Sequence, residues 1–376
     1  MNPLGLLSGD PGTFLREVWG RRILIHEVDP AELAAIFGIA DADHLITTTA
    51  LRTPQVRLAK DGAVVDPTRY TRGATIAGQP MTGLVDARKA LALFDGGATI
   101  VFQGLQRYWE PLRLLVGGLE QELGHPCQAN AYLTPPGSQG FALHSDTHDV
   151  FTFQTYGTKE WEVHDADGVH QVLMKPGTSM YLPTGTPHLA RTGEGAASLH
   201  VTLGINQVVW ADVLKGVVTA AIDADAAQRD RLPAAPFAAP AGLAAALSGR
   251  LSDLAALLSG LDATAEVDRL EASFSTGRQP VLAGGLRDLL DVRELGADTP
   301  LRRRSGSQCT LKERDGSLVL LLGDRRITLP GAAHAAVRFV VDANGLRPSD
   351  LPGIDQAGAL ILCRRLVREG FLEVVR

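Results

Sequence analysis

Short segments of alternating apolar and polar residues run through the first 207 positions, separated by glycine and proline. The clearest are TIVFQ, NAYLT, VFTFQTY, EWEV, SMYLP and LHVTL, all between residues 99 and 203. Short alternating strands split by turn signals are typical of a β sandwich or barrel. Three stretches with apolar residues at helical spacing, at residues 13–20, 86–94 and 110–123, predict helices added to this barrel.

The pattern changes at about residue 208. Alanine and leucine recur at helical spacing in VVWADVLKGVVTAAIDADAAQRDRL and in LAAALSGRLSDLAALLSGL, with the proline-rich joint PAAPFAAPAG between them, which predicts a helical segment. Beyond residue 300, a strand, a Gly-Asp turn and a second strand (SLVLLLGDRRITLP) precede two helical stretches and the strand FLEVV. That order outlines a winged helix. We therefore expect a barrel domain at 1–207, a helical domain at 208–299 and a winged helix at 300–376.

Composition and charge narrow the class of protein. An apolar content of 45% and a charged content of 21% are those of a globular protein, and a net charge of -6 argues against a surface built for nucleic acid. Residues 301–376 carry 13 lysines and arginines against 8 aspartates and glutamates, a net +5 that leaves -11 for the rest. A basic winged helix can touch nucleic acid, but its second helix mixes basic and apolar residues. A structural or protein-contact role is therefore the preferred interpretation.

Cysteine usage and hydropathy predict a cytoplasmic setting. Cys127, Cys309 and Cys363 are far apart and form no CxxC pair, so neither a disulfide framework nor a thiolate zinc site is indicated. The first 20 residues lack a basic start followed by an apolar run, and no stretch of about 18 consecutive apolar residues occurs. We expect neither a signal peptide nor a membrane span.

Two histidines and an aspartate are candidate metal ligands. His144 and Asp146 are two residues apart, so on an extended strand their side chains leave the same face. His188 follows the turn YLPTGTP, from which a side chain can point into the mouth of a barrel. Two imidazoles and one carboxylate on one face of an ion form the facial triad of non-heme Fe(II) oxygenases, which keeps the opposite positions open.

An HxD tripeptide alone is weak evidence, and a lone His144 is more often a structural histidine. His148 and Asp149 are nearby competitors, but four residues of extended strand place His148 too far from His144 to share one ion. We interpret His148 and Asp149 either as a solvated pair or as a pair that supports the metal ligands without touching the ion.

Further polar residues alternate onto the inner face of the expected barrel. Lys159 shares its face with Trp161 and Val163, so its ammonium is either buried, where it needs an anion such as the distal carboxylate of a dicarboxylate, or extended to the surface. Asn130 and Tyr132 share a second face, and Ser198 precedes a strand beyond His188. Each of these three is also compatible with core packing and a hydrogen bond.

The segments NAYLTPPGSQGFALHSDTHDVFTFQTYGTKEWEV, KPGTSMYLPTGTPHLA and SLHVTL resemble the JmjC ribosomal oxygenases of the cupin superfamily. The resemblance implies a double-stranded β-helix (cupin jelly roll) followed by a helical dimerisation region and a winged helix that does not read DNA. It implies Fe(II) as cofactor and 2-oxoglutarate as cosubstrate in the hydroxylation of a protein or peptide side chain, with a ribosomal protein as a candidate substrate. By position, the implied site residues are the iron ligands His144, Asp146 and His188, the cosubstrate residue Lys159, and Ser198, Asn130 and Tyr132 around the site.

Two positions depart from the family pattern. Val101 stands near the place of an arginine that faces the substrate, and Gly204 stands where a serine can occur. Both bear on the substrate and neither on the iron. A peptide natural product or a free amino acid is therefore an alternative target. A metal-binding sensor or an idle scaffold is the alternative of another class, although such a protein is expected to lose a ligand or the cation.

Overall fold

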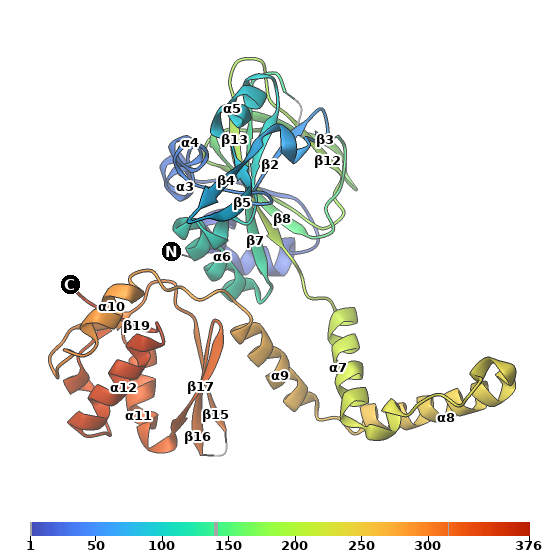
Figure 1. The fold of residues 1–376 in the computed structure, drawn as a ribbon, viewed down its shortest axis with the longest axis vertical. Coiled ribbons are helices and arrows are strands. Elements are labelled where there is room, and N and C mark those ends of the chain that lie inside the picture. The colour runs from blue at the N-terminus through green and yellow to red at the C-terminus, as the bar shows by residue number, and fades with distance from the viewer. Residues whose placement is uncertain (1, 139–141, 315) are drawn as a thin grey trace. The chain divides into compact units, whose positions relative to one another are not determined.

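The computed structural model describes residues 2–138, 142–314 and 316–376 (Figure 1). Residues 139–141 of the motif quoted above lie outside the described residues. The chain divides into two units, Met1–Gln207 and Val208–Arg376. The further division at residue 299 stays a prediction.

The N-terminal unit is built on two antiparallel sheets. The larger has the order β1 (Leu24–Glu27), β11 (Thr178–Leu182), β8 (Asp149–Tyr156), β13 (Ser198–Ile205), β7 (Cys127–Thr134), β6 (Thr99–Phe102), β2 (Val56–Lys60) and β3 (Ala63–Val64). The smaller has the order β10 (Gly168–Met174), β9 (Lys159–Asp165) and β12 (His188–Arg191). A separate hairpin pairs β4 (Thr71–Ile76) with β5 (Gln79–Val85).

The two faces of the larger sheet belong to different cores. On β13, Leu199, Val201 and Leu203 are fully buried in a core shared with the helices of this unit. These helices and turns are α1 (Pro3–Ser8), α2 (Pro11–Thr13), η1 (Phe14–Val18), α3 (Pro30–Ile36), α4 (Ile39–Thr48), η2 (Pro67–Arg69), α5 (Ala87–Asp95), η3 (Leu105–Arg107) and α6 (Glu110–Leu123). On the opposite face, Met180 of β11 packs with Trp161 of β9, in the core between the sheets. Each such buried side chain contributes about 1.5–3 kcal/mol.

The two sheets pack face to face, and strands β7 to β13 have the order given above. This arrangement is the double-stranded β-helix expected from the sequence. Local signals set the helices on it. Asp86 caps α5 by accepting a hydrogen bond from the backbone N–H of Lys89 at 3.2 Å, and Gly124 ends α6 with a φ of +72°. The helix expected at residues 13–20 is instead one π-helical turn, η1, that follows the short α2.

The C-terminal unit combines helices with two small sheets. Its first part holds α7 (Trp210–Ala224), η4 (Ala226–Arg229), η5 (Pro236–Ala238), α8 (Pro240–Ser259), α9 (Ala263–Thr276) and α10 (Gly285–Asp291). Its second part holds β14 (Leu301–Arg303), β15 (Cys309–Arg314), β16 (Ser317–Leu322), β17 (Arg325–Pro330), η6 (Gly331–Ala333), α11 (His334–Asp342), β18 (Gly345–Leu346), η7 (Pro348–Asp350), α12 (Gln356–Arg368) and β19 (Leu372–Val374). The sheets have the orders β15-β16-β17 and β18-β14-β19.

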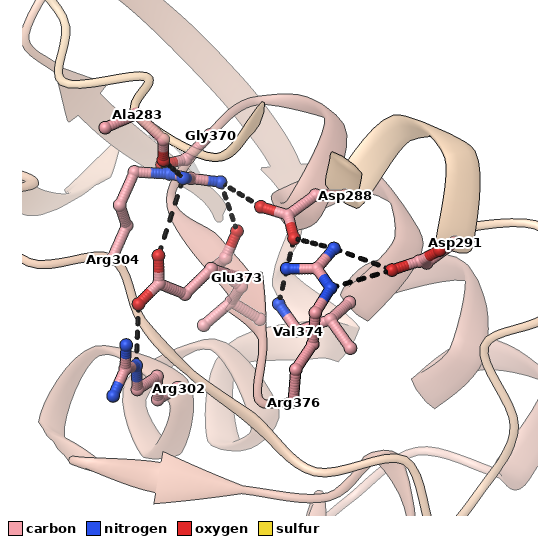
Figure 2. Close-up of polar contacts among 10 residues, drawn as sticks. Ala283, Asp288, Asp291, Arg302, Arg304, Gly370, Glu373, Val374 and Arg376 are labelled. Atoms are coloured by element: carbon pink, nitrogen blue, oxygen red, sulfur yellow. Dashed lines mark hydrogen bonds and ion pairs between the residues drawn. The ribbon is translucent and has the colours of Figure 1, made fainter. Parts of the chain in front are cut away.

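A buried ion-pair network joins α10, β14 and β19 (Figure 2). Arg304 and Asp288 are 2% and 1% exposed, and their side chains form a direct ion pair. Arg304 Nε also donates to the carbonyl of Gly370 at 2.9 Å, while Arg376 Nη2 donates to Asp288 Oδ1 at 3.1 Å. Removing Arg304 would leave the buried Asp288 carboxylate with only Arg376, which is 40% exposed, and breaking a buried ion pair costs about 3–5 kcal/mol.

Helix α8 is long and apolar enough to cross a membrane by length and composition alone, a test that core helices of soluble proteins also pass. Its 20 residues include Arg250 and Asp253, and none of the helix is buried within the chain.

Candidate metal centre

The backbone brings the two candidate histidines face to face. His144 and His188 form an isolated antiparallel bridge in which His188 N donates to His144 O at 2.8 Å and His144 N donates to His188 O at 3.1 Å. Residues paired in this way project their side chains from the same face of the ladder. Accordingly, the two imidazole centroids lie 4.5 Å apart.

Hydrogen bonds orient both rings. His144 Nδ1 donates to the carbonyl of Ala142 at 2.8 Å, and His188 Nδ1 donates to the carbonyl of Thr186 at 3.0 Å. These bonds place the proton on Nδ1 and leave each Nε2 as a ligand, as in many metal sites. Burial lowers the pKa of His188, which favours the neutral form that binds metal.

Asp146 completes the cluster. One ligand atom from each of His144, Asp146 and His188 lies within 4.8 Å of the others, and Asp146 Oδ2 is 3.7 Å from His188 Nε2. His188 is buried, Asp146 is half-buried and His144 is exposed, so the cluster is open on one side. Three donors on one side of an ion are the arrangement that leaves coordination positions for other ligands.

Asp149 holds the turn that carries His188. This carboxylate is 3% exposed and accepts hydrogen bonds from the Thr184 backbone at 2.8 Å, the Thr184 hydroxyl at 2.6 Å, Gln207 Nε2 at 3.1 Å and the Tyr181 hydroxyl. Of the two alternatives for Asp149, the solvated residue is wrong, and the residue that supports the metal ligands agrees with these contacts. Its charge is stabilised by four donors.

The same turn is also tied to the HxD segment. Gly185 N donates to the carbonyl of Asp146 at 2.9 Å, and Gly185 has a φ of +80°, a conformation that glycine adopts without strain. The turn thereby fixes Asp146 and His188 relative to each other.

Lys159 lies on the inner face of β9 and is only 3% exposed. The alternative in which this lysine extends to the surface is therefore wrong. Its Nζ donates to Thr134 Oγ1 at 3.1 Å, and no carboxylate among the described residues forms an ion pair with it. Burial lowers the pKa of Lys159 to about 7. An anion beside this ammonium would restore its charge.

Aromatic rings connect His200 of β13 to the candidate ligand His188. His200 of β13 stacks on Tyr132 at a centroid distance of 4.9 Å and meets the edge of Trp161 at 5.5 Å, and Trp161 lies 5.6 Å from His188. Burial, and next the charge of Lys159, lower the pKa of His200 well below its usual range. The sequence analysis missed His200, although its alternation with Ser198 on one strand placed it on the inner face.

Several polar atoms on this inner face are buried without a hydrogen-bond partner among the described residues. They are Thr152 Oγ1, Gln154 Oε1, Trp161 Nε1 and His200 Nδ1. Buried polar groups are rarely unpaired, so these atoms indicate a polar occupant. A buried cation, orphaned polar atoms and a two-histidine, one-carboxylate cluster fit a metal ion together with a carboxylate-bearing cosubstrate.

The three remaining candidates lie on the same face in different settings. The Ser198 hydroxyl is fully buried and accepts a hydrogen bond from Gln154 Nε2 at 3.0 Å. The carboxamide of Asn130 accepts a hydrogen bond from the backbone of Gly104 at 3.0 Å. Burial raises the pKa of Tyr132, and the Asp146 carboxylate raises it further. Tyr132 and Asp146 are therefore close enough for their charges to interact.

Val101 occupies the place where an arginine was expected, and Arg57 lies beside it on the neighbouring strand β2. Val101 is fully buried and is paired in register with Arg57 of β2 on one side and Tyr132 of β7 on the other. Directly opposite residues share a face, so Arg57 and Tyr132 lie on the same face of the sheet. The charge of Arg57 accordingly lowers the pKa of Tyr132.

Comparison with known proteins identifies relatives of this chain. The JmjC domain family matches residues 119–213. Ribosomal oxygenase 1 of Homo sapiens is 28% identical over 237 residues, which cover 57% of this chain and 36% of the human protein. Ribosomal oxygenase 2 of Bos taurus is 34% identical over 208 residues, which cover 49% of this chain and 45% of the bovine protein. The chain thus matches less than half the length of these two relatives.

A solved structure matches nearly the whole chain. YcfD, a ribosomal oxygenase from Escherichia coli in complex with cobalt and 2-oxoglutarate, superposes with a TM-score of 0.56 at 14% identity. The match covers 97% of this chain and 98% of YcfD. The likeness shows a common fold.

Proposed function

The chain belongs to the JmjC ribosomal oxygenase family, and from this premise we propose that it is an Fe(II)- and 2-oxoglutarate-dependent oxygenase. The reaction would be hydroxylation of a side chain of a protein or peptide. The observation that carries this proposal is the placement of a two-histidine, one-carboxylate cluster and a buried lysine on the same side of the sheets.

Each residue has a distinct task in this reaction. The Nε2 atoms of His144 and His188 and the carboxylate of Asp146 would hold the metal. When bound, Fe(II) and 2-oxoglutarate supply the activation of dioxygen for C–H hydroxylation. Lys159 would pair with the carboxylate of 2-oxoglutarate remote from the metal, and Thr134 would orient the ammonium through their 3.1 Å hydrogen bond.

A ribosomal protein is the first candidate substrate. Support comes from the names of the relatives and from the net charge of -11 outside residues 301–376, since an acidic surface attracts basic ribosomal segments. Hydroxylation of a peptide natural product or a free amino acid is the second candidate, favoured by the departure at Val101. A metal-binding sensor or scaffold without turnover would need neither Lys159 nor Thr134.

We also propose a role for the C-terminal unit. The helices of residues 208–299 would mediate homodimerisation, supported by the exposure of Trp210 on α7 and of Leu247 and Leu251 on α8. Residues 300–376 would form a winged helix that makes structural or protein contacts and does not bind nucleic acid. The three free cysteines support a cytoplasmic location, and we propose no membrane partner.

Succinate formation tests the proposed reaction. The purified protein is incubated with Fe(II), 2-oxoglutarate and proteins extracted from ribosomes of the source organism, and the extract is searched by mass spectrometry for a gain of one oxygen atom. We expect succinate and a hydroxylated side chain. Binding of both Fe(II) and 2-oxoglutarate without succinate would favour the sensor or scaffold. Succinate with hydroxylation of small peptides or amino acids alone would favour the second candidate.

A further inference from the structure

The inner face of the large sheet has a closed end and an open end. Residues of β7 and β13 face each other there in four pairs: Thr134 with Ser198, Tyr132 with His200, Asn130 with Thr202, and Gln128 with Gly204. The first pair is fully buried. In the second and fourth pairs one member, Tyr132 or Gln128, is partly exposed beside a buried partner, and in the third pair both Asn130 and Thr202 are partly exposed. Exposure therefore begins at the second pair and continues toward the fourth.

The metal cluster lies between these ends. Lys159 contacts Thr134 of the closed pair. His188 lies 5.6 Å from Trp161, and Trp161 lies 5.5 Å from His200 of the second pair, measured between ring centroids. A cosubstrate held by Lys159 therefore occupies the closed end. A substrate must approach the metal from the side of the third and fourth pairs.

At the fourth pair, the imidazole of His148 occupies the space that a side chain at position 204 would fill. A Cβ atom on Gly204 would lie 2.6 Å from His148 Nε2, 2.8 Å from His148 Cδ2 and 3.2 Å from Gln128 Nε2. Carbon atoms do not approach other atoms to 2.6 Å without displacement. The imidazole of His148 therefore lies directly on the backbone of Gly204, which it can do because residue 204 is glycine.

His148 is also positioned close to the metal ligands along the chain. The chain bends at residues 147 and 148, and Asp149, immediately after the bend, is held by its four hydrogen bonds. The backbone that follows His148 is therefore fixed, and the side chain of His148 is half-buried. A side chain held at the approach to a metal centre is suited to contact a substrate.

We infer that His148 and Gln128 form a substrate-contacting subsite at the open end, and that Gly204 is the residue that admits His148 to it. This inference rests on the proposed function. An imidazole and a carboxamide each offer a hydrogen-bond donor and an acceptor. The subsite therefore takes a polar, hydrogen-bonding side chain of a peptide, and His148 determines specificity without touching the metal or the cosubstrate.

Four variants and one control separate hydrogen bonding from packing. His148→Phe keeps an aromatic ring over Gly204 but removes its hydrogen bonds, and His148→Ala removes the ring. Gly204→Ser displaces the imidazole, and the double variant His148→Ala, Gly204→Ser tests whether the two positions act through the same contact. His170→Ala is the control, since it removes an exposed imidazole on β10.

Two readouts are needed. Succinate formation without added protein substrate gives kcat and KM for 2-oxoglutarate and reports on folding, metal and cosubstrate. Hydroxylation of the extracted ribosomal proteins, followed by mass spectrometry, gives kcat/KM for the substrate. We expect His148→Phe and His148→Ala to keep the KM for 2-oxoglutarate within about twofold and to lose roughly tenfold or more in kcat/KM for the substrate, the effect of about 1.4 kcal/mol.

In the wild-type background, Gly204→Ser should lose roughly tenfold or more in kcat/KM for the substrate, as the His148 variants do. In the His148→Ala background, the same substitution should lower kcat/KM by less than about twofold further, because the effects of two residues in contact are not additive. Wild-type hydroxylation by His148→Phe, or independent losses for Gly204→Ser and His148→Ala, would overturn the inference while leaving the proposed function intact. Absence of succinate from the unsubstituted protein with Fe(II) and 2-oxoglutarate would overturn both.

Discussion

Replacing Lys159 with methionine should stabilise the metal-free protein and abolish cosubstrate binding. Methionine has a similar length and no charge, so it removes the cost of a buried ammonium while filling its space. The shift of the Lys159 pKa from 10.5 to about 7 corresponds to a cost of about 5 kcal/mol for the charged form, at 1.36 kcal/mol per unit. That cost is present because Lys159 is only 3% exposed and no carboxylate among the described residues pairs with it.

The stabilisation should depend on pH in a defined direction. The folded protein releases the Lys159 proton near pH 7, while the unfolded chain keeps it until about pH 10.5, so the wild-type protein gains stability across this interval as pH rises. The advantage of Lys159→Met should therefore be full below pH 7, on the order of 5 kcal/mol, and should shrink toward pH 10.5. Other titrating groups are common to both proteins and cancel in the difference.

Urea unfolding of both metal-free proteins at pH 6 and pH 10 measures this difference. Calorimetric titration of the cobalt-loaded proteins with 2-oxoglutarate measures the second effect, a loss of affinity of 10²-fold or more, since breaking a buried ion pair costs about 3–5 kcal/mol. Lys175→Met is the matched control, because that side chain is 62% exposed. Equal stability of wild type and Lys159→Met at pH 6 would refute the claim that Lys159 is a destabilising buried charge. Unchanged affinity for 2-oxoglutarate would refute its pairing with the cosubstrate.

Three further changes have defined outcomes. His188→Ala should abolish retention of Fe(II) or Co(II), measured by metal analysis after gel filtration, and a full metal complement would exclude His188 as a ligand. Asp149→Asn should weaken metal affinity by about 10–100-fold through the loosened turn and lower the free energy of unfolding by roughly 1–3 kcal/mol, measured by Co(II) titration and urea unfolding. Unchanged values would mean that the hydrogen bonds of Asp149 are dispensable. Arg304→Met should lower the free energy of unfolding by about 3–5 kcal/mol, because buried Asp288 loses its buried partner and keeps only Arg376, which is 40% exposed. The loss is measured as an earlier urea unfolding transition, and the double variant Arg304→Met, Asp288→Leu should recover part of it.

Local pattern was enough to find the strands and the three candidate ligands. The alternation of Lys159, Trp161 and Val163 placed them on one face, where all three are buried on the inner side of β9. His144 and Asp146, together with the proline-flanked His188, indicated a shared ion, and the structure brings the three within 4.8 Å. These predictions depend on geometry within a strand or a turn, which the sequence encodes directly.

Features that depend on tertiary pairing were not predictable. The sequence could not decide whether Asp149 is solvated or supports the metal ligands, because its four donors come from positions 181, 184 and 207. Arg57 could not be placed beside Val101, since the register between β2 and β6 joins segments more than 40 residues apart. The contact of His148 with Gly204 likewise joins distant strands, and strands β14 and β15 were missed because their short sequences lack strong alternation.

The most direct test of the metal centre is anomalous diffraction from crystals grown with Co(II) and 2-oxoglutarate. We predict one strong anomalous peak bonded to Nε2 of His144, a carboxylate oxygen of Asp146 and Nε2 of His188, with the cosubstrate's far carboxylate on Nζ of Lys159. A metal bound elsewhere, a fourth protein ligand closing the open side, or a cosubstrate carboxylate distant from Lys159 would contradict the proposed oxygenase site.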